Sequence, residues 1–262
     1  MNEFRLDNSD LSFALVAGKE KNCKACDHPK EAPIVLEAAR AKLKVYDIKD
    51  SIQPSKYALE GDTFKHSNAD GYEEILVEND DHRDRLSVYS AEDLSDLLML
   101  IKDRTNSLSA YEFGKNLVIS RRVGGHGYFD ITITEIPHLN GGTCRVCQNT
   151  KNTANREIKK TENFVAFVPY SPHQEIEVEI APIKHLKIGD MDSVLSFDLA
   201  GLIKRLLNAG KFETIALVER EYGHFTVKLY GRDVSNMEIL GIRTINTEPE
   251  LLAKALRERL SV

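Results

Sequence analysis

The sequence predicts an α+β protein made of two similar halves, residues 1–135 and 136–262. The first observation behind this prediction is a Cys-x-x-Cys pair followed by two widely spaced histidines, an order that occurs twice. The second is that segments of alternating apolar and polar residues, typical of strands, recur between these motifs. The third is one amphipathic helix in each half, between its two histidines. Each half is therefore predicted to form an antiparallel sheet with one main helix.

Four strands and one helix are predicted in the first half. The strands cover residues 43–48, 71–78, 111–120 and 130–134. Ser90 is placed to cap the helix, and Glu92 and Asp93 suit the positive end of its dipole. The apolar stripe of this helix consists of Leu94, Leu97, Leu98 and Ile101. Residues 1–20 have no clear period, and residues 52–68 are expected to form a loop.

The second half repeats this plan. Its strands are predicted at residues 163–168, 175–180, 212–220 and 225–230. The segment 175–180 alternates strictly between glutamate and aliphatic residues, so it is expected to leave its glutamates in water. An apolar-striped helix over residues 191–208 is stopped by Gly210. Pro249 is expected to start a last helix that reaches about Leu260.

The composition limits the classes of function. The chain has 262 residues, a net charge of −6 and 42% hydrophobic residues, so it is acidic and can bury a core. This charge argues against a protein that binds nucleic acid through bulk electrostatics. No apolar run is long enough to span a bilayer, and the first residues lack the basic and apolar regions of a signal peptide. A cytoplasmic protein is therefore expected, in which paired cysteines indicate metal or redox chemistry more often than disulfides.

Two metal sites are predicted from the repeated motif. The eight candidate ligands are Cys23, Cys26, His82 and His126 in the first half and Cys144, Cys147, His185 and His224 in the second. A Cys-x-x-Cys turn lets two thiolates converge, and histidines at the ends of neighbouring strands complete the tetrahedral shell that zinc prefers. Because each shell holds four protein ligands, a structural role is expected for both zinc ions.

Three other interpretations of these residues are open. The Cys-x-x-Cys pairs are compatible with redox chemistry, but this leaves the repeated histidines unexplained. The paired histidines are compatible with ordinary surface positions, since four further histidines have no counterpart in the repeat: His28, His66, His138 and His173. The third interpretation is that one of the two sites has been lost.

The order of these motifs resembles the galactose-1-phosphate uridylyltransferase family of the histidine-triad superfamily, over nearly the whole chain. The most specific segments lie after Cys144; they are residues 164–170, 175–185, 199–207, 241–246 and 249–250. In the first half, residues 71–78 and His82 resemble that family's Gly-x-His-Glu-Val-x-Val-Glu strand and zinc histidine, although Glu73 replaces the histidine of the strand. The resemblance implies a duplicated histidine-triad-like half-barrel with two structural zinc sites, nucleotide or nucleotide-sugar ligands, and homodimers.

The resemblance also places a changed residue at the position of the catalytic nucleophile. The family has a His-x-His-x-Gln motif, in which the first histidine binds zinc, the second forms a covalent nucleotidyl intermediate and the glutamine holds the phosphate. At the matching positions this chain has His126, Tyr128 and Asp130. A register with His126 as the nucleophile would put Gly124 at the zinc position, and the place of His224 at the start of its own strand argues against this register.

Tyr128 and Asp130 change the chemistry expected at this position. A phenol with a pKa of about 10 is a poor nucleophile at neutral pH, and a carboxylate repels phosphate unless a cation compensates it. No catalytic residue is therefore assigned, and the expected function is zinc binding without nucleotidyl transfer. The expected contacts of a nucleotide or sugar phosphate are Arg121, Arg122, Tyr128 and Asp130.

Two alternative functions stay open. One is an active nucleotidyltransferase of the hexose-1-phosphate uridylyltransferase class that uses a different nucleophile. The other is a non-catalytic scaffold or regulator. Arg121 and Arg122 discriminate between them, because a basic pocket open to solvent favours a phosphate ligand. Ion pairs between these arginines and the chain's own carboxylates favour the scaffold.

Overall fold

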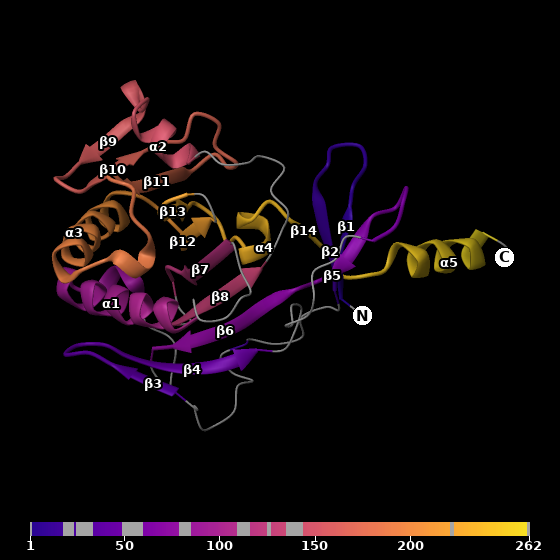
Figure 1. Ribbon diagram of the computed structural model, residues 1–262, viewed down its shortest axis with the longest axis horizontal. Coiled ribbons are helices and arrows are strands. Elements are labelled where there is room, and N and C mark those ends of the chain that lie inside the picture. The colour runs from indigo at the N-terminus through magenta and orange to yellow at the C-terminus, as the bar shows by residue number, and fades with distance from the viewer. Residues whose placement is uncertain are drawn as a thin grey trace.

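The computed structural model describes residues 2–17, 24, 34–48, 60–78, 85–108, 116–124, 127–134, 144–220 and 223–260. These residues form a ten-stranded sheet, a separate four-stranded sheet and five α-helices (Figure 1). The α+β class is thus confirmed. The strands do not form one independent sheet in each half, as the sequence had predicted.

The large sheet contains five strands from residues before 135 and five from residues after it. The first five are β3 (Ile34–Glu37), β4 (Lys42–Ile48), β6 (Gly71–Val77), β7 (Asn116–Arg122) and β8 (Tyr128–Thr134). The next five are β9 (Glu157–Lys160), β10 (Phe164–Phe167), β11 (Glu177–Pro182), β12 (Thr214–Arg220) and β13 (Thr226–Tyr230). Counted inward from its own outer edge, each set has its strands in the order first, second, third, fifth, fourth.

The two sets of strands join at a central seam between β7 and β12. These strands pair antiparallel over their full length, from Asn116 opposite Arg220 to Arg122 opposite Thr214. The expectation of two separate sheets is wrong for this reason. A strand left at the edge of a half-sheet exposes unpaired N–H and C=O groups, and pairing β7 with β12 satisfies both rows at once.

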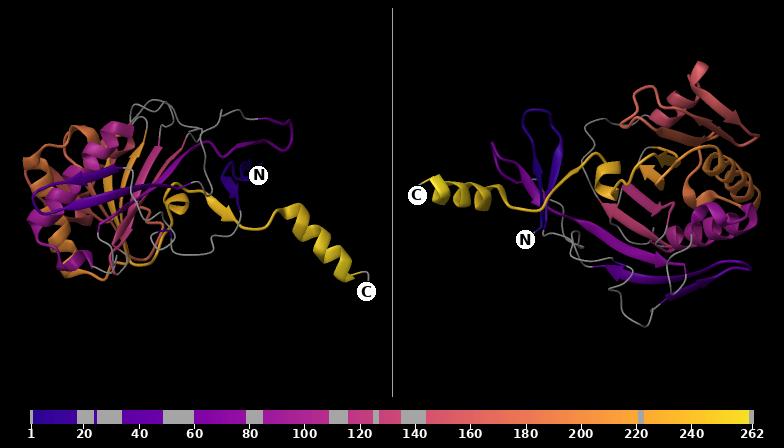
Figure 2. Two further views of the ribbon diagram at one scale, coloured as in Figure 1. Left: turned by 90° about the horizontal axis from the view of Figure 1, so that it is seen from below. Right: turned by 180° about the vertical axis from the view of Figure 1, so that it is seen from behind.

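Two long helices cover one face of the large sheet. Helix α1 (Ala91–Leu108) and helix α3 (Ser193–Ala209) lie side by side, as two views agree (Figures 1 and 2), and their apolar stripes form the main core with the sheet. At the start of α1, the Asp93 amide donates to the Ser90 hydroxyl at 3.1 Å, and the Ser90 amide donates to the Asp93 carboxylate at 2.9 Å. The predicted helices and the predicted cap at Ser90 are therefore confirmed.

A buried serine pair marks the contact between the two helices. The hydroxyl oxygens of Ser95 on α1 and Ser196 on α3 lie 2.7 Å apart, and the Ser196 hydroxyl donates to the Ser95 carbonyl at 2.9 Å. Small side chains let the helix backbones approach closely, and the hydrogen bonds satisfy the polar atoms that this approach buries.

The expectation that the glutamates of residues 175–180 lie in water holds for Glu175, which is exposed, and is wrong for the other two. Glu177 and Glu179 on β11 are buried, at 2% and 5% exposure. Lys228 on the neighbouring strand β13 places its Nζ 3.1 Å from Glu177 and 3.6 Å from Glu179. The amide of His173 also donates to Glu177 at 2.7 Å. A cation on the adjacent strand thus makes the burial of an alternating polar strand possible.

The four-stranded sheet was not predicted. It combines β1 (Glu3–Leu6), β2 (Phe13–Val16) and β5 (His66–Asn68) with β14 (Arg243–Ile245), which pairs parallel to β2. Phe4 and Leu15 from this sheet share a core with Met237 of helix α4 (Asn236–Ile239) and with Val118 and Val218 on the second face of the large sheet. Residues near both ends of the chain therefore meet in one layer.

The remaining helices are peripheral. Helix α2 (Arg145–Thr150) precedes β9, and the short 3₁₀ turns η1 (Leu86–Val88), η2 (Ala154–Arg156) and η3 (Ile188–Asp190) connect longer elements. Helix α5 (Pro249–Leu260), at the predicted position, extends away from both sheets in every view (Figures 1 and 2). Among the described helices, no stretch is both long and apolar enough to cross a membrane.

Candidate functional site

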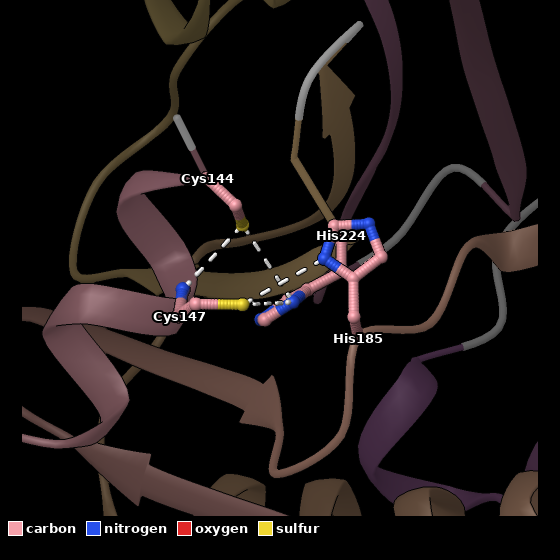
Figure 3. A group of neighbouring side chains, drawn as sticks. All are labelled: Cys144, Cys147, His185 and His224. Carbon is pink, nitrogen blue, oxygen red and sulfur yellow. Dashed lines mark hydrogen bonds between the residues drawn. The ribbon is translucent and has the colours of Figure 1, made fainter. Parts of the chain in front are cut away.

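The predicted metal ligands of the second half come from three neighbouring elements. Cys144 is the N-cap residue of α2, and Cys147 lies in the first turn of that helix. His185 follows the end of β11, and His224 precedes β13. Because β11 and β13 are antiparallel neighbours, the end of one and the start of the other lie at the same edge of the sheet. The four side chains converge there (Figure 3).

The geometry of this cluster fits a tetrahedral ion. The four ligand atoms lie within 4.8 Å of one another. The Nδ1 atom of His224 lies 3.7 Å from the sulfur of Cys144 and 3.5 Å from that of Cys147, and the Nδ1 atom of His185 lies 3.6 Å from the sulfur of Cys147. Tetrahedral zinc with ordinary bond lengths requires sulfur-to-nitrogen separations of about 3.6 Å. The distances therefore match a zinc shell without rearrangement.

The electrostatics of the cluster favour metal ligands. His224 is 1% exposed, and its burial, together with the nearby His185, lowers the pKa of its imidazole to about 4. The ring is thus neutral at pH 7 and its Nδ1 lone pair is available. Burial opposes ionisation of Cys144, but hydrogen bonds around its sulfur, first among them from the Cys147 amide at 3.4 Å, lower the pKa of this thiol overall. Burial and the adjacent Cys144 raise the pKa of Cys147.

The donor set indicates which kind of ion these residues hold. Two thiolates and two imidazoles are the ligands that zinc takes in structural sites, whereas magnesium and calcium require oxygen ligands. All four positions of a tetrahedron are filled by protein atoms, so no position is left for a reacting water. The other predicted set, Cys23, Cys26, His82 and His126, lies outside the described residues, so the expected second ion remains a prediction.

A small cavity lies beside the position predicted for the lost nucleophile. Its volume is about 180 Å³, and its lining includes Ser120, Arg122, Tyr128 and Asp130. Tyr128 is half-buried and packs against an apolar cluster of Tyr46, Ile48, Ile75 and Val77. All four predicted phosphate contacts, Arg121, Arg122, Tyr128 and Asp130, are among the residues that line this cavity.

The fourth predicted contact, Arg121, points its side chain to the other face of the sheet. It alternates along β7 with Arg122, so the two side chains leave opposite faces. Its guanidinium is fully buried and bonds to Glu78, with Nε 2.5 Å from Oε1 and Nη2 2.9 Å from Oε2. The rings of Tyr89 and Phe129 flank this pair. Arg121 thus belongs to the core beneath the helices.

The cations of the cavity are paired with carboxylates of the same chain. The Nζ of Lys24 lies 2.9 Å from Oδ2 of Asp130. The guanidinium of Arg122 forms an ion pair with Asp233, on the segment that leads into α4. Two positive charges and two negative charges therefore compensate each other around the cavity. Such a lining has no strong attraction for a phosphate.

Several cavity residues were missed by sequence reasoning. Lys24, Asp233, Ser235 and Asn236 contribute to the lining, and Asn236 donates hydrogen bonds of 2.9 Å to the Asp130 carbonyl and to the Thr132 hydroxyl. One usable signal was present, because Ser235 and the acidic residue three positions later form the Ser-x-x-Glu pattern of a helix start. The Ser235 hydroxyl does cap α4 at 3.2 Å. Nothing local pointed to the contact of α4 with β8.

Comparison with known proteins gives matches in structure only. No protein-family model and no curated protein matches the chain. A uridylyltransferase structure is similar with a TM-score of 0.64 at 19% identity, covering 99% of this chain and 98% of that one. A GalT-like protein from Arabidopsis thaliana has a TM-score of 0.58 at 18% identity, over 98% and 99% of the two chains. An ADP-glucose phosphorylase from Arabidopsis thaliana, with bound ADP-glucose, has a TM-score of 0.53 at 18% identity, over 98% of both chains.

These matches extend over nearly the whole length of both partners in each comparison. At such identities they show the fold and leave the chemistry to be argued from the residues of this chain. The resemblance read from the sequence is therefore confirmed at the level of architecture: this chain has the fold of the uridylyltransferase and GalT-like structures.

Proposed function

We propose that this chain is a zinc-binding protein with the uridylyltransferase fold that does not perform nucleotidyl transfer. The observation that carries the proposal is the environment of Asp130. In the match to the resembling family, Asp130 stands where that family has the glutamine that holds phosphate, and the Asp130 carboxylate is held by Lys24 at 2.9 Å. A phosphate would have to compete with the Asp130 carboxylate for Lys24, which disfavours its binding.

Zinc would be held by Cys144, Cys147, His185 and His224. Bound there, it supplies structural cross-linking and no open coordination position. The ligands tie α2 to the adjoining ends of β11 and β13. Their proposed role is to hold the edge of the second half together.

Tyr128 is a poor candidate for a replacement nucleophile. Attack on a phosphorus atom requires the phenolate, which is scarce at neutral pH because a free phenol has a pKa of about 10. Tyr128 packs against the cluster of Tyr46, Ile75 and Val77. The proposed role of Tyr128 is packing between β6 and β8, whose residues Val77 and Tyr128 are direct neighbours.

The two arginines support a scaffold or regulator over a nucleotide-processing enzyme. Arg121 is paired with Glu78 and Arg122 with Asp233. The cavity of about 180 Å³ is also below the roughly 300–1,000 Å³ of most small-molecule sites. Its size suits a phosphate or a single sugar ring, so binding of a whole nucleotide would require displacement of the cavity-lining ion pairs, Lys24 with Asp130 and Arg122 with Asp233.

We further infer that the chain arose by internal duplication, with the halves dividing near residue 135. The support is the shared strand order of the two five-strand sets and the equivalent placement of α1 and α3. The contact between Ser95 and Ser196, each in the first turns of its helix, lies where a twofold relation would place it.

The proposal is tested by metal analysis and by a labelling experiment. Elemental analysis of the purified chain should find zinc, and a Cys144→Ser/Cys147→Ser variant should contain one zinc fewer per chain. Incubation with a nucleotide sugar labelled in its α-phosphate should leave no label on the protein and no turnover. Turnover that persists in the wild-type chain and disappears in a Tyr128→Phe variant would contradict the loss of transfer chemistry.

Calorimetric titration tests the ligand. Uridine and adenosine monophosphates, their diphosphate sugars and inorganic phosphate should bind the wild-type chain with dissociation constants no tighter than the millimolar range. Micromolar binding of any nucleotide would show that the ion pairs open for a ligand, and would favour the enzyme over the scaffold.

A further inference from the structure

Helix α5 leaves an apolar surface uncovered. It buries none of its residues, and it extends away from both sheets in all three views (Figures 1 and 2). Its leucines are strongly exposed: Leu251 at 56%, Leu252 at 52%, Leu256 at 48% and Leu260 at 88%. Four leucines on one helix form an apolar patch larger than the single exposed residues that are normal on a protein surface.

The leucines form a stripe on a defined side of the helix. Leu252, Leu256 and Leu260 are spaced by four residues and therefore share one face. Glu250 lies on a different side, where its two carboxylate oxygens accept hydrogen bonds of 2.8 and 3.0 Å from Arg5 of β1. This ion pair fixes the first turn to the small sheet, so the leucine stripe faces away from its own chain.

A helix of this length needs a partner to be stable. It has 12 residues, and isolated helices shorter than about 12–15 residues are marginal in water. Packing of an amphipathic face supplies most of the stability of helices in proteins. No residue in the described part of the chain covers this face, so the leucines are accessible to a partner.

We propose that α5 pairs with α5 of a second copy of this chain, in an antiparallel arrangement around a twofold axis. A twofold contact uses the same patch on both copies, which suits a stripe that is complementary to itself. The charges select the direction. Glu248 and Glu250 lie at the start of the helix, and Arg257 and Arg259 lie in its last turn. Antiparallel packing places the acidic start of each helix beside the basic end of the other, and it also opposes the two helix dipoles favourably.

The size of this contact sets its strength. A pair of helices each about 18 Å long buries on the order of 800 Å², less than the roughly 1,200–2,000 Å² of stable interfaces. The dimer should therefore form and dissociate at micromolar concentrations, and dissociation should expose and loosen α5.

Sedimentation of the zinc-loaded full chain from 1 to 200 µM tests the proposal. The expected result is a rise from the monomer mass toward the dimer mass. A Leu252→Glu/Leu256→Glu variant should stay monomeric, with its dissociation constant raised more than 30-fold. The matched control is Lys254→Glu, which adds the same side chain on the polar face and should shift the constant less than threefold. Zinc content and circular dichroism verify the fold of each variant, since α5 contributes nothing to either core.

Two further measurements sharpen the test. Amide exchange of residues 249–260 should slow as concentration rises, because pairing stabilises the helix. Raising the salt concentration from 0.05 to 0.5 M should weaken the dimer, since it screens the complementary ends; a dimer strengthened by salt would overturn the antiparallel arrangement.

The contrary outcomes are distinct. A chain that stays monomeric at 200 µM overturns the proposal, and monomers that bind vesicles of anionic lipid through α5 would identify a membrane surface as the partner instead. A dimer that survives in the Leu252→Glu/Leu256→Glu variant overturns it as well, because another surface then holds the copies together. Neither result bears on zinc content or nucleotide transfer.

Discussion

Lys24 places its ammonium group 2.9 Å from the carboxylate of Asp130. This contact joins the residue between Cys23 and Cys26 to the strand that carries Tyr128, more than one hundred residues later in the sequence. It brings Lys24 into the lining of the cavity, where its ammonium group compensates the charge of Asp130.

Neutralising Asp130 should restore affinity for phosphate. In an Asp130→Asn variant the amide keeps the shape of the side chain, and Lys24 becomes available to an anion. Because both groups are partly exposed, we expect a gain in phosphate affinity of about 3- to 10-fold, measured by calorimetry. Asp103→Asn, at an exposed position on α1, is the control with the same chemical change. Equal affinities in all three proteins would mean that the Asp130 carboxylate does not block the cavity.

The adjacent arginines Arg121 and Arg122 should differ sharply in their effect on stability. Arg121→Met leaves Glu78 as a buried carboxylate that keeps the hydrogen bond from the Tyr89 hydroxyl but loses its counter-charge, and should lower the free energy of unfolding by about 3–5 kcal/mol. Arg122→Met removes an ion pair at the surface and should cost less than about 1 kcal/mol. Urea unfolding at pH 7 measures both. If Arg122→Met proved the more damaging change, the placement of these side chains on opposite faces would be wrong.

The metal cluster should contribute to stability through His224. A His224→Ala variant should lose one zinc per chain and unfold at a temperature lower by roughly 10 °C, because the free energy of metal binding is lost from the folded state. The control is His173→Ala, at an exposed position outside the cluster. Elemental analysis and calorimetric unfolding provide the two readings. A variant with unchanged zinc content would remove His224 from the shell.

The stability of the chelated, metal-free protein should depend on pH through the same residue. The pKa of His224 is lowered to about 4 in the folded protein, below the value of about 6.5 expected in the unfolded chain. Between these values the unfolded chain binds more protons, so the free energy of unfolding should fall as the pH drops from about 6.5 through about 4. Urea unfolding at intervals across this range should give a shallower dependence in His224→Gln than in the wild type or in His173→Gln. Parallel curves for all three would contradict the lowered pKa.

The sequence was most informative where a pattern is long and local. Strand β6 and helix α1 each extend over two or more periods of their structure, and both were predicted within a few residues. The cluster of Cys144 and His224 was also accessible, because a Cys-x-x-Cys turn and strand-end histidines are chemical signals that do not depend on burial.

The rest depended on contacts between distant segments. Strands β5 and β14 have only three residues each, too few to show a period, and β14 pairs with residues more than two hundred positions earlier. The burial of Glu177 was hidden because its counter-charge, Lys228, lies on another strand. Arg121 was predicted to contact a phosphate because the sequence did not show that its guanidinium is buried against Glu78.

The central seam between β7 and β12 has a consequence for how the two five-strand sets can change. If the two sets of strands belonged to two identical chains, every substitution would occur in both sets. A residue that suited one set would then also be present in the other. In this chain the corresponding positions are independent: Asp130 lies four residues after His126, and Lys228 lies four residues after His224. They bear opposite charges, and each is neutralised by different partners. Covalent linkage across one sheet thus lets each set of strands change without the other, as the opposite charges at these two positions illustrate.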